Sequence, residues 1–220
     1  MALANDSILV TPGSGATVAT ETVGGKEHQV VIVADASGHL QGTLPSYNWM
    51  TPSSAAGANK LHADIFNASG SGKVMDVRGI WLVPDTDVAV VGALGIRIDL
   101  YRTSAVGTGG TAAPYKSATP DVAGGNITPF DTANAALPAQ VTARHLPTGG
   151  ATISEWLIAT YTLGEETATS MAFLSQYMNI LPVLTVGQKL TVREGQGLLL
   201  KQGAIAATGN IAFLVTFTLE

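Results

Sequence analysis

The chain has 220 residues, enough for one large β domain or for a domain with an extended arm. Charged residues make up only 12% of it, the net charge is −5, and cysteine is absent. An acidic chain without a basic cluster is not expected to bind nucleic acid, and the lack of cysteine excludes disulfides, thiolate chemistry and cysteine-based zinc sites. So little charge suits a protein whose surface is covered in an assembly, although a chain rich in Ala, Gly and Thr has the same property.

The N-terminal region alternates short apolar stretches with turns. Residues 8–10 are apolar and precede Thr-Pro-Gly-Ser-Gly, a strong turn signal. Residues 17–22 are β-branched and polar, a Gly-Gly turn follows, and residues 28–33 are a second strand candidate. Residues 42–58 are rich in Pro, Ser, Gly and Ala, so we expect no regular structure there. We therefore predict an N-terminal arm with short strands and a linker over residues 1–58.

Apolar and aromatic side chains on such an arm are candidates for contact with other proteins. Tyr and Trp are frequent anchors of protein interfaces. For the two aromatic residues of the linker, a loop packed onto the domain is an equal alternative. The candidate interface residues are Ile8, Leu9, Val10, Val30, Ile32, Tyr47 and Trp49.

The sequence carries no membrane signal. Its opening residues lack a basic segment followed by an apolar run, so we expect no secretory signal and synthesis in the cytosol. The most apolar tract, residues 88–96, is too short to span a bilayer and is bounded by Asp87 and Arg97. We expect a soluble protein without a membrane partner.

Strand patterns follow one another from residue 59 onward. Residues 61–67 and 153–163 are strand candidates, and residues 96–101 alternate apolar and polar side chains as a half-buried strand does. Residues 74–83 form another candidate. We expect its buried parity to consist of Met75, Val77, Trp81 and Val83.

The C-terminal stretch, residues 187–220, predicts strand, turn, strand, turn, strand, which we interpret as hairpins. The expected strands are residues 188–192, 198–202 and 210–219. In the last of them one parity is large and apolar and needs a cover: Ile211, Phe213, Val215, Phe217 and Leu219. We expect an opposite sheet that contains residues 74–83 and 96–101 to cover it. Leu214 and the run from Leu198 to Leu200 predict that a neighbouring subunit covers the second face.

Residues 104–151 are a long insertion rich in Gly, Ala, Thr and Pro. Structureless loops of this length are uncommon in compact domains, and short strand-like pieces such as residues 139–144 are expected in it. Short strands with Gly-rich turns and no long amphipathic helix predict an all-β fold. Our prediction is an antiparallel jelly-roll-like β-sandwich over residues 59–220, with an extended N-terminal arm and this long loop insertion.

The polar motifs do not predict an active site. Ser-Gly-Ser-Gly-Lys at residues 69–73 is similar to part of a phosphate-binding loop, but it lacks the full glycine pattern and precedes a strand, so we interpret it as a hairpin turn. The 4 histidines are too widely spaced for a metal motif. We expect His145 to be exposed, and His28 and His62 to have hydrogen-bonded structural roles.

The two acidic pairs do not predict a catalytic site either. Asp85 and Asp87 follow a proline, which is first of all turn chemistry, although they could bind calcium together with loop carbonyls. Glu165 and Glu166 are sequence neighbours, which does not establish a glycosidase pair. The Gly-x-Ser-x-Gly elbow of many hydrolases is missing. We therefore expect no enzyme, no catalytic residue, no cofactor and no metal.

Two stretches of the chain carry a resemblance. One runs Asp6-Ser-Ile-Leu-Val-Thr-Pro-Gly-Ser-Gly-Ala-Thr-Val-Ala-Thr20, with Gly25-Lys-Glu-His-Gln-Val-Val31 and Asp35-Ala-Ser-Gly-His-Leu40 after it. It resembles the start of structural proteins of tailed bacteriophages. The other, Leu190-Thr-Val-Arg-Glu-Gly-Gln-Gly-Leu-Leu-Leu200 before the closing strand, looks like the last hairpins of a jelly-roll capsid-decoration (cement) or head-associated protein. The second is a likeness of fold only.

This resemblance implies a non-enzymatic virion structural protein, most simply a capsid decoration protein that is made in the host cytoplasm and lies on the head surface. Its partners would be the major capsid protein and further copies of itself, as a trimer or a similar cyclic oligomer. Residues 1–50 would supply capsid contacts by adding strands to exposed sheet edges, and residues 60–220 would form the oligomeric domain. Two alternatives stay open: a tail or baseplate protein that binds a host-surface glycan through residues 104–151, and an enzyme on a β-sandwich scaffold.

Overall fold

The computed structural model divides the chain into two units, Met1–Thr43 and Leu44–Glu220. It describes residues 19–23, 26–30, 44–84, 96–116, 123–132, 134–157, 159–163, 178–179, 190–207 and 209–220. All regular elements in these residues are β-strands, so the all-β prediction is confirmed. Among them there is no helix with the length and apolarity needed to cross a membrane.

The N-terminal unit contains one antiparallel pair of strands, β1 (Ala19–Val23) and β2 (Lys26–Val30). The ladder runs from Ala19 opposite Val30 to Val23 opposite Lys26. The two strands therefore flank the Gly24-Gly25 dipeptide, as the sequence predicts for a hairpin.

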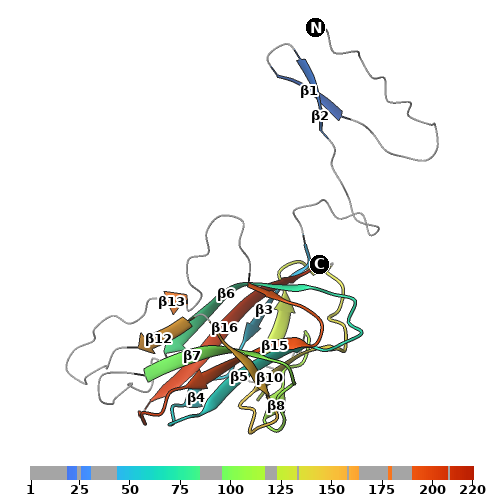
Figure 1. Cartoon of the computed structure of the whole chain (residues 1–220). Helices are drawn as coiled ribbons and strands as arrows, with labels where there is room; N and C mark the ends of the chain where they lie inside the picture. Colours follow the sequence, from blue (N-terminus) through green and yellow to red (C-terminus); the bar gives the residue numbers. More distant parts are fainter. Residues whose placement is uncertain are drawn as a thin grey trace. The chain divides into compact units, whose positions relative to one another are not determined.

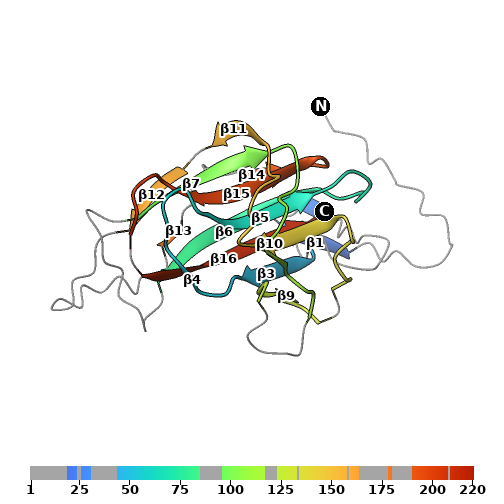
Figure 2. The same cartoon turned by 90° about the horizontal axis from the view of Figure 1, so that it is seen from below.

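The second unit is a β-sandwich of two antiparallel seven-stranded sheets (Figures 1 and 2). Sheet I has the order β11-β7-β15-β5-β10-β8, with β12 also paired to β7. Its strands are β5 (Leu61–Asn67), β7 (Ile96–Thr103), β8 (Thr111–Ala112), β10 (Val141–His145), β11 (Ile153–Leu157), β12 (Ala159–Leu163) and β15 (Gln196–Gln202).

Sheet II has the order β13-β6-β16-β3-β9, with β14 paired to β6 and β4 paired to β16. Its central strand β16 and the neighbouring β6 are the longest elements of the described chain. The strands of this sheet are β3 (Ser46–Met50), β4 (Ser54–Ala55), β6 (Met75–Pro84), β9 (Asn126–Pro129), β13 (Met178–Asn179), β14 (Leu190–Val192) and β16 (Asn210–Leu219).

The core lies between the two sheets and is built on the apolar parity of β16. All five predicted side chains of that parity are at most 3% exposed. Sheet I contributes the alternate residues of its central strands, among them Ile98, Leu100, Leu198 and Leu200. Because each fully buried side chain of this size stabilises the fold by roughly 2 kcal/mol, this layer is the main source of stability.

The C-terminal strands are not hairpins, which corrects the prediction. β14 lies in sheet II, β15 in sheet I and β16 again in sheet II, so each connection crosses from one sheet to the other. The same holds for the Ser-Gly-Ser-Gly-Lys turn, which joins β5 in sheet I to β6 in sheet II. The prediction that residues 74–83 lie in the sheet opposite β16 is wrong, because β6 pairs directly with β16. β7, predicted over residues 96–101, does lie in the opposite sheet. The alternation of apolar and polar residues is the same whether consecutive strands pair in a hairpin or lie in different sheets. It therefore cannot distinguish the two arrangements.

A β-bulge in β6 reverses the parity predicted for its second half. Val77 pairs with Phe217 and Gly79 with Thr216, so Arg78 is an extra residue on this strand. Met75 and Val77 face the core as predicted. Beyond the bulge the core residues are Ile80 and Leu82, and the predicted Trp81 and Val83 are only half-buried.

The linker predicted over residues 42–58 belongs to the sandwich from Leu44 onward. β3 pairs with β16 on one side and β9 on the other, and β4 pairs with the start of β16. The unit boundary therefore falls between Thr43 and Leu44, not at residue 58. The polar, Pro-rich composition of this segment wrongly indicated a linker. The segment forms a strand because Tyr47 and Trp49, at the inward positions of β3, are buried in the core.

Residues 104–151 also belong to the sandwich. They supply β8 and β10 to sheet I and β9 to sheet II, and the strand expected near residues 139–144 is confirmed as β10. β10 pairs with β5 over its whole length, and β9 pairs with β3. This segment thus extends both sheets at the same end of the sandwich.

Candidate functional site

Tyr47 and Trp49, two of the predicted interface residues, are core residues of β3. Tyr47 is 1% exposed, stacks on Phe217 with 5.4 Å between ring centroids, and donates a hydrogen bond of 2.8 Å to the carbonyl of Ala135. Burial raises the pKa of Tyr47 to about 12. Trp49 is 0% exposed, and its indole N–H donates to the carbonyl of Gly124 at 3.0 Å. Neither ring is available to a partner in this fold.

The other predicted interface residues are in the N-terminal unit. Val30 is the last residue of β2 and pairs with Ala19. Ile8, Leu9, Val10 and Ile32 lie outside the described residues, as do the acidic pairs Asp85 with Asp87 and Glu165 with Glu166.

A buried polar network joins Ser54, His62 and Gln202 near one end of the sandwich. The Ser54 hydroxyl lies 3.3 Å from Nδ1 of His62, and Nε2 of His62 lies 3.2 Å from Oε1 of Gln202. His62 is 0% exposed, and burial lowers its pKa to about 4. The imidazole is hydrogen-bonded on both ring nitrogens and closed to water, which confirms the hydrogen bonding predicted for His62.

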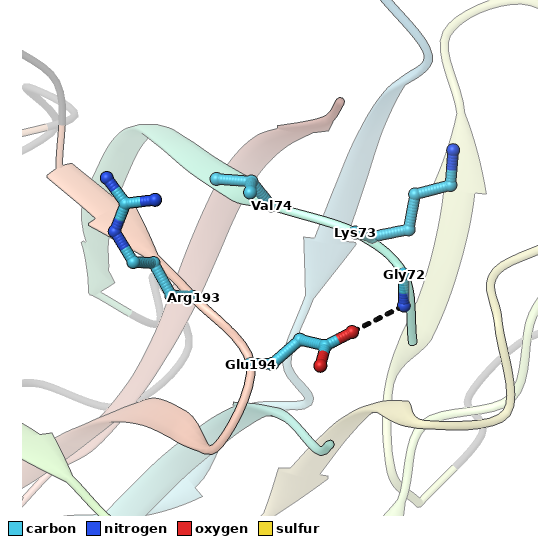
Figure 3. A pocket seen from close by; sticks show the side chains of 5 residues that line it. All are labelled: Gly72, Lys73, Val74, Arg193 and Glu194. Carbon is cyan, nitrogen blue, oxygen red and sulfur yellow. Dashed lines mark hydrogen bonds between the residues drawn. The ribbon is translucent and has the colours of Figure 1, made fainter. Parts of the chain in front are cut away.

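The Ser-Gly-Ser-Gly loop does bind an anion, but the anion belongs to the chain itself. The carboxylate of Glu194 accepts a hydrogen bond from the backbone N–H of Gly72 at 2.6 Å (Figure 3). It accepts a second one from the backbone N–H of Gly70 at 3.3 Å. Both glycines have positive φ, which turns their N–H groups to one side as in anion-binding nests. These bonds lower the pKa of Glu194. Lys73 and Arg193 line the same shallow depression of about 300 Å³.

Two of the chain's own loops lie over part of the outer face of sheet I, at Asp64 and Arg144. We call these two loops the flap; they are residues 104–110 and 146–150. The Thr108 N–H donates to the Gly149 carbonyl at 2.7 Å and the Thr148 N–H to the Thr108 carbonyl at 2.9 Å, which joins the loops. The backbone N–H of Gly107 donates to Oδ2 of Asp64 on β5 at 2.7 Å.

Burial that the sequence predicts for contact with a neighbouring subunit is present within the single chain at residues 198–200. Leu199 of β15, on this outer face beside Asp64, is 1% exposed within the single chain. Leu198 and Leu200 on the opposite parity are core residues. His145, predicted to be exposed, is 6% exposed, and its Nδ1 lies 3.0 Å from the carbonyl of Ala123.

The outer face of sheet II is different, because it exposes an apolar row. Leu214 of β16 pairs with Trp81 of β6 on one side and with Met50 of β3 on the other. Met50 is 42% exposed and the other two are half-buried. We call these three residues the outer row. Uncharged Thr216 and Asn48, joined by a hydrogen bond of 2.9 Å, lie next to it.

Within the part of the chain that the structure describes, the outer row is a group of neighbouring apolar residues that favours contact with another protein. Aromatic residues and methionine are enriched and charge is depleted at interface centres. Sequence reasoning noticed Leu214 but assigned Trp81 to the core and did not consider Met50. The signal that could have found them is Gly79, since an isolated glycine in a strand pattern indicates a bulge and a change of parity.

Among the residues that the structure describes, there is no group of three or more His, Asp or Glu side chains that could hold a metal ion. Comparison of the chain with protein-family models, with curated proteins and with solved structures found no match.

Proposed function

We propose that the chain is a non-enzymatic structural protein of a phage virion, a capsid decoration protein that assembles through its β-sandwich. The proposal has two supports: the resemblance of the opening segment to phage structural proteins, and the uncharged outer row on sheet II. The outer row carries the argument. Contiguous apolar residues on an outer sheet face often mark a site of contact with another protein.

The polar groups that could suggest catalysis are used within the fold. Ser54, His62 and Gln202 bond one another, Glu194 fills the glycine loop, and Asp64 holds the flap. This distribution favours a scaffold over an enzyme. In the proposed assembly the sandwich contacts other copies of itself, most simply as a trimer, and the N-terminal unit contacts the major capsid protein.

Native mass spectrometry tests the self-assembly part. Leu214→Lys places a charge in the outer row and is expected to reduce the mass to that of one chain without unfolding it. The matched control is Thr142→Lys, which places the same charge on β10 at a half-buried position of sheet I and is expected to leave the mass unchanged. A monomeric wild-type protein, or an oligomer that survives Leu214→Lys, contradicts the assembly.

Cosedimentation with heads of the encoding phage tests the capsid part. The truncation must remove residues 1–43 only, because a cut at residue 50 also removes β3 from the sandwich. The truncated protein is expected to stay folded and oligomeric and to lose capsid binding. Binding equal to that of the full chain contradicts the role of the N-terminal unit.

One observation supports the second candidate, a tail or baseplate protein that binds a host-surface glycan. Phe130, which follows β9 in the segment 104–151, is 61% exposed, and an exposed ring offers an apolar face to a sugar. A glycan array decides between the two. Competable binding that is lost in Phe130→Ala favours the glycan function, and the absence of binding favours decoration.

A further inference from the structure

The buried carboxylate of Asp64 beneath the flap has no role in the proposed assembly. It lies on the outer face of sheet I and is 1% exposed. Oδ2 accepts the Gly107 N–H, but Oδ1 is buried without a hydrogen-bond partner. A buried ion that lacks partners is costly, whereas a neutral carboxylic acid is tolerated at much lower cost.

The flap fits closely over this carboxylate. A Cβ on Gly107 would lie 2.8 Å from Oδ2 of Asp64 and 2.9 Å from the Cβ of Pro147, so the glycine is what allows the backbone to reach the carboxylate. Arg144, directly opposite Asp64 in the ladder, donates a hydrogen bond of 3.0 Å to the carbonyl of Gly109. The flap is thus attached at two successive points to side chains of sheet I.

The elements packed against Asp64 bring few other charged or titratable side chains to this face. β10 contributes the cation Arg144, and the outer positions of β7 and β15 contribute Arg97, Asp99, Tyr101 and Lys201 farther along the face. The flap itself contains no ionisable side chain. His62 on β5 packs on Phe213 of sheet II at 5.6 Å, so it faces the core.

We propose that the flap is a proton-linked lid on the outer face of sheet I, closed while Asp64 holds a proton and loosened when the carboxylate ionises. Ionisation places a charge against Leu199 and the flap backbone. Lifting the flap lets water reach both carboxylate oxygens. This inference is independent of the proposed assembly, because it concerns the opposite sheet and one chain.

The pKa of Asp64 agrees with its burial beneath the flap. Burial raises the pKa of Asp64 from 3.8 to about 6, against the smaller lowering effects of the Gly107 hydrogen bond and of Arg144. Opening returns the carboxylate to water and to its ordinary pKa. The equilibrium for opening is then expected to increase roughly fiftyfold between pH 4 and pH 7.

Amide hydrogen exchange by mass spectrometry, corrected for the intrinsic pH dependence of exchange, tests the lid. In the wild-type protein, protection of peptides covering residues 104–110 is expected to fall with pH by about the same factor while β15 and β16 stay protected. Asp64→Asn, which keeps the shape but cannot ionise, is expected to show protection that does not change with pH. Asp99→Asn, which removes a carboxylate from the same sheet, is expected to keep the wild-type response.

A second variant covers the case in which Asp64→Asn does not fold. Gly107→Ala cannot hold the closed contact, so its flap is expected to exchange rapidly at every pH. Wild-type protection that is constant from pH 4 to pH 7, a fall of equal size in Asp64→Asn, or full flap protection in Gly107→Ala would each overturn the lid.

Discussion

The indole of Trp81 occupies the space in which a side chain on Gly79 would begin. A Cβ built on Gly79 would lie 2.0 Å from Cη2 of Trp81, a distance that real Cβ atoms do not reach. Gly79 follows the bulged residue Arg78, so the glycine serves both the bulge and the packing of Trp81 on the outer face. The outer row therefore depends on a residue without a side chain.

Replacing Gly79 by alanine is expected to displace Trp81 and to lower the free energy of unfolding by about 1–3 kcal/mol, as overpacking usually does. Urea denaturation followed by far-UV circular dichroism measures the change. Gly149→Ala is the matched control, because the nearest atom to its Cβ would be Thr108 Oγ1 at 3.9 Å. Equal stability of the two variants would show that Trp81 moves aside without cost.

The Glu194 carboxylate is expected to protect the glycine loop. Its pKa is lowered chiefly by the Gly72 N–H, so its contribution is present above the ordinary carboxyl pKa and is lost as the pH falls through the lowered value. Glu194→Ala should speed the exchange of the Gly70 and Gly72 amides at pH 7, measured by NMR. Arg193→Gln, in the same turn, should leave both amides as slow as in the wild type; an unchanged Gly72 amide in Glu194→Ala would argue against the nest.

The contributions of Asp64 and His62 to the free energy of unfolding are expected to change in opposite directions as the pH rises. The pKa of Asp64 is raised to about 6, so its stabilisation is complete below pH 3.8 and is lost as the pH rises toward 6. The pKa of His62 is lowered to about 4, so its stabilisation is complete above pH 6.5 and is lost as the pH falls toward 4. Each effect is about 3 kcal/mol, with opposite signs over the same pH range.

Thermal or urea denaturation from pH 4 to pH 6.5 separates the two effects. Relative to the wild type, the free energy of unfolding of Asp64→Asn should rise with pH, and that of His62→Gln should fall with pH. Parallel pH profiles for all three proteins would contradict both assignments.

The boundary between the units leads to a sharp prediction for truncations. Removal of residues 1–43 is expected to leave the melting temperature of the sandwich unchanged, because β3 and its hydrogen bonds remain. Removal of residues 1–50 deletes Tyr47 and Trp49 from the core and leaves β16 and β9 without their shared neighbour. This shorter protein is expected not to fold, as judged by circular dichroism and by its heat of unfolding. A cooperative transition in it would place the boundary nearer residue 58.

Much of the strand content could be read from alternation alone. The final strand was predicted as residues 210–219 and is observed as Asn210–Leu219, with its apolar parity in the core. Strands predicted over 96–101 and 153–163 correspond to β7 and to the pair β11 and β12. These signals are local, because a period of two reports which side of a strand is buried.

What tertiary structure decided was which strands are neighbours and what covers each outer face. The sequence by itself determined an all-β sandwich with the β16 parity in its core, since burial of apolar side chains is encoded residue by residue. It did not determine that the C-terminal strands cross between sheets, that the bulge at Arg78 turns Trp81 outward, or that the flap contacts the buried Asp64. Each of these depends on contacts between residues far apart in the chain, and no local pattern carries that information.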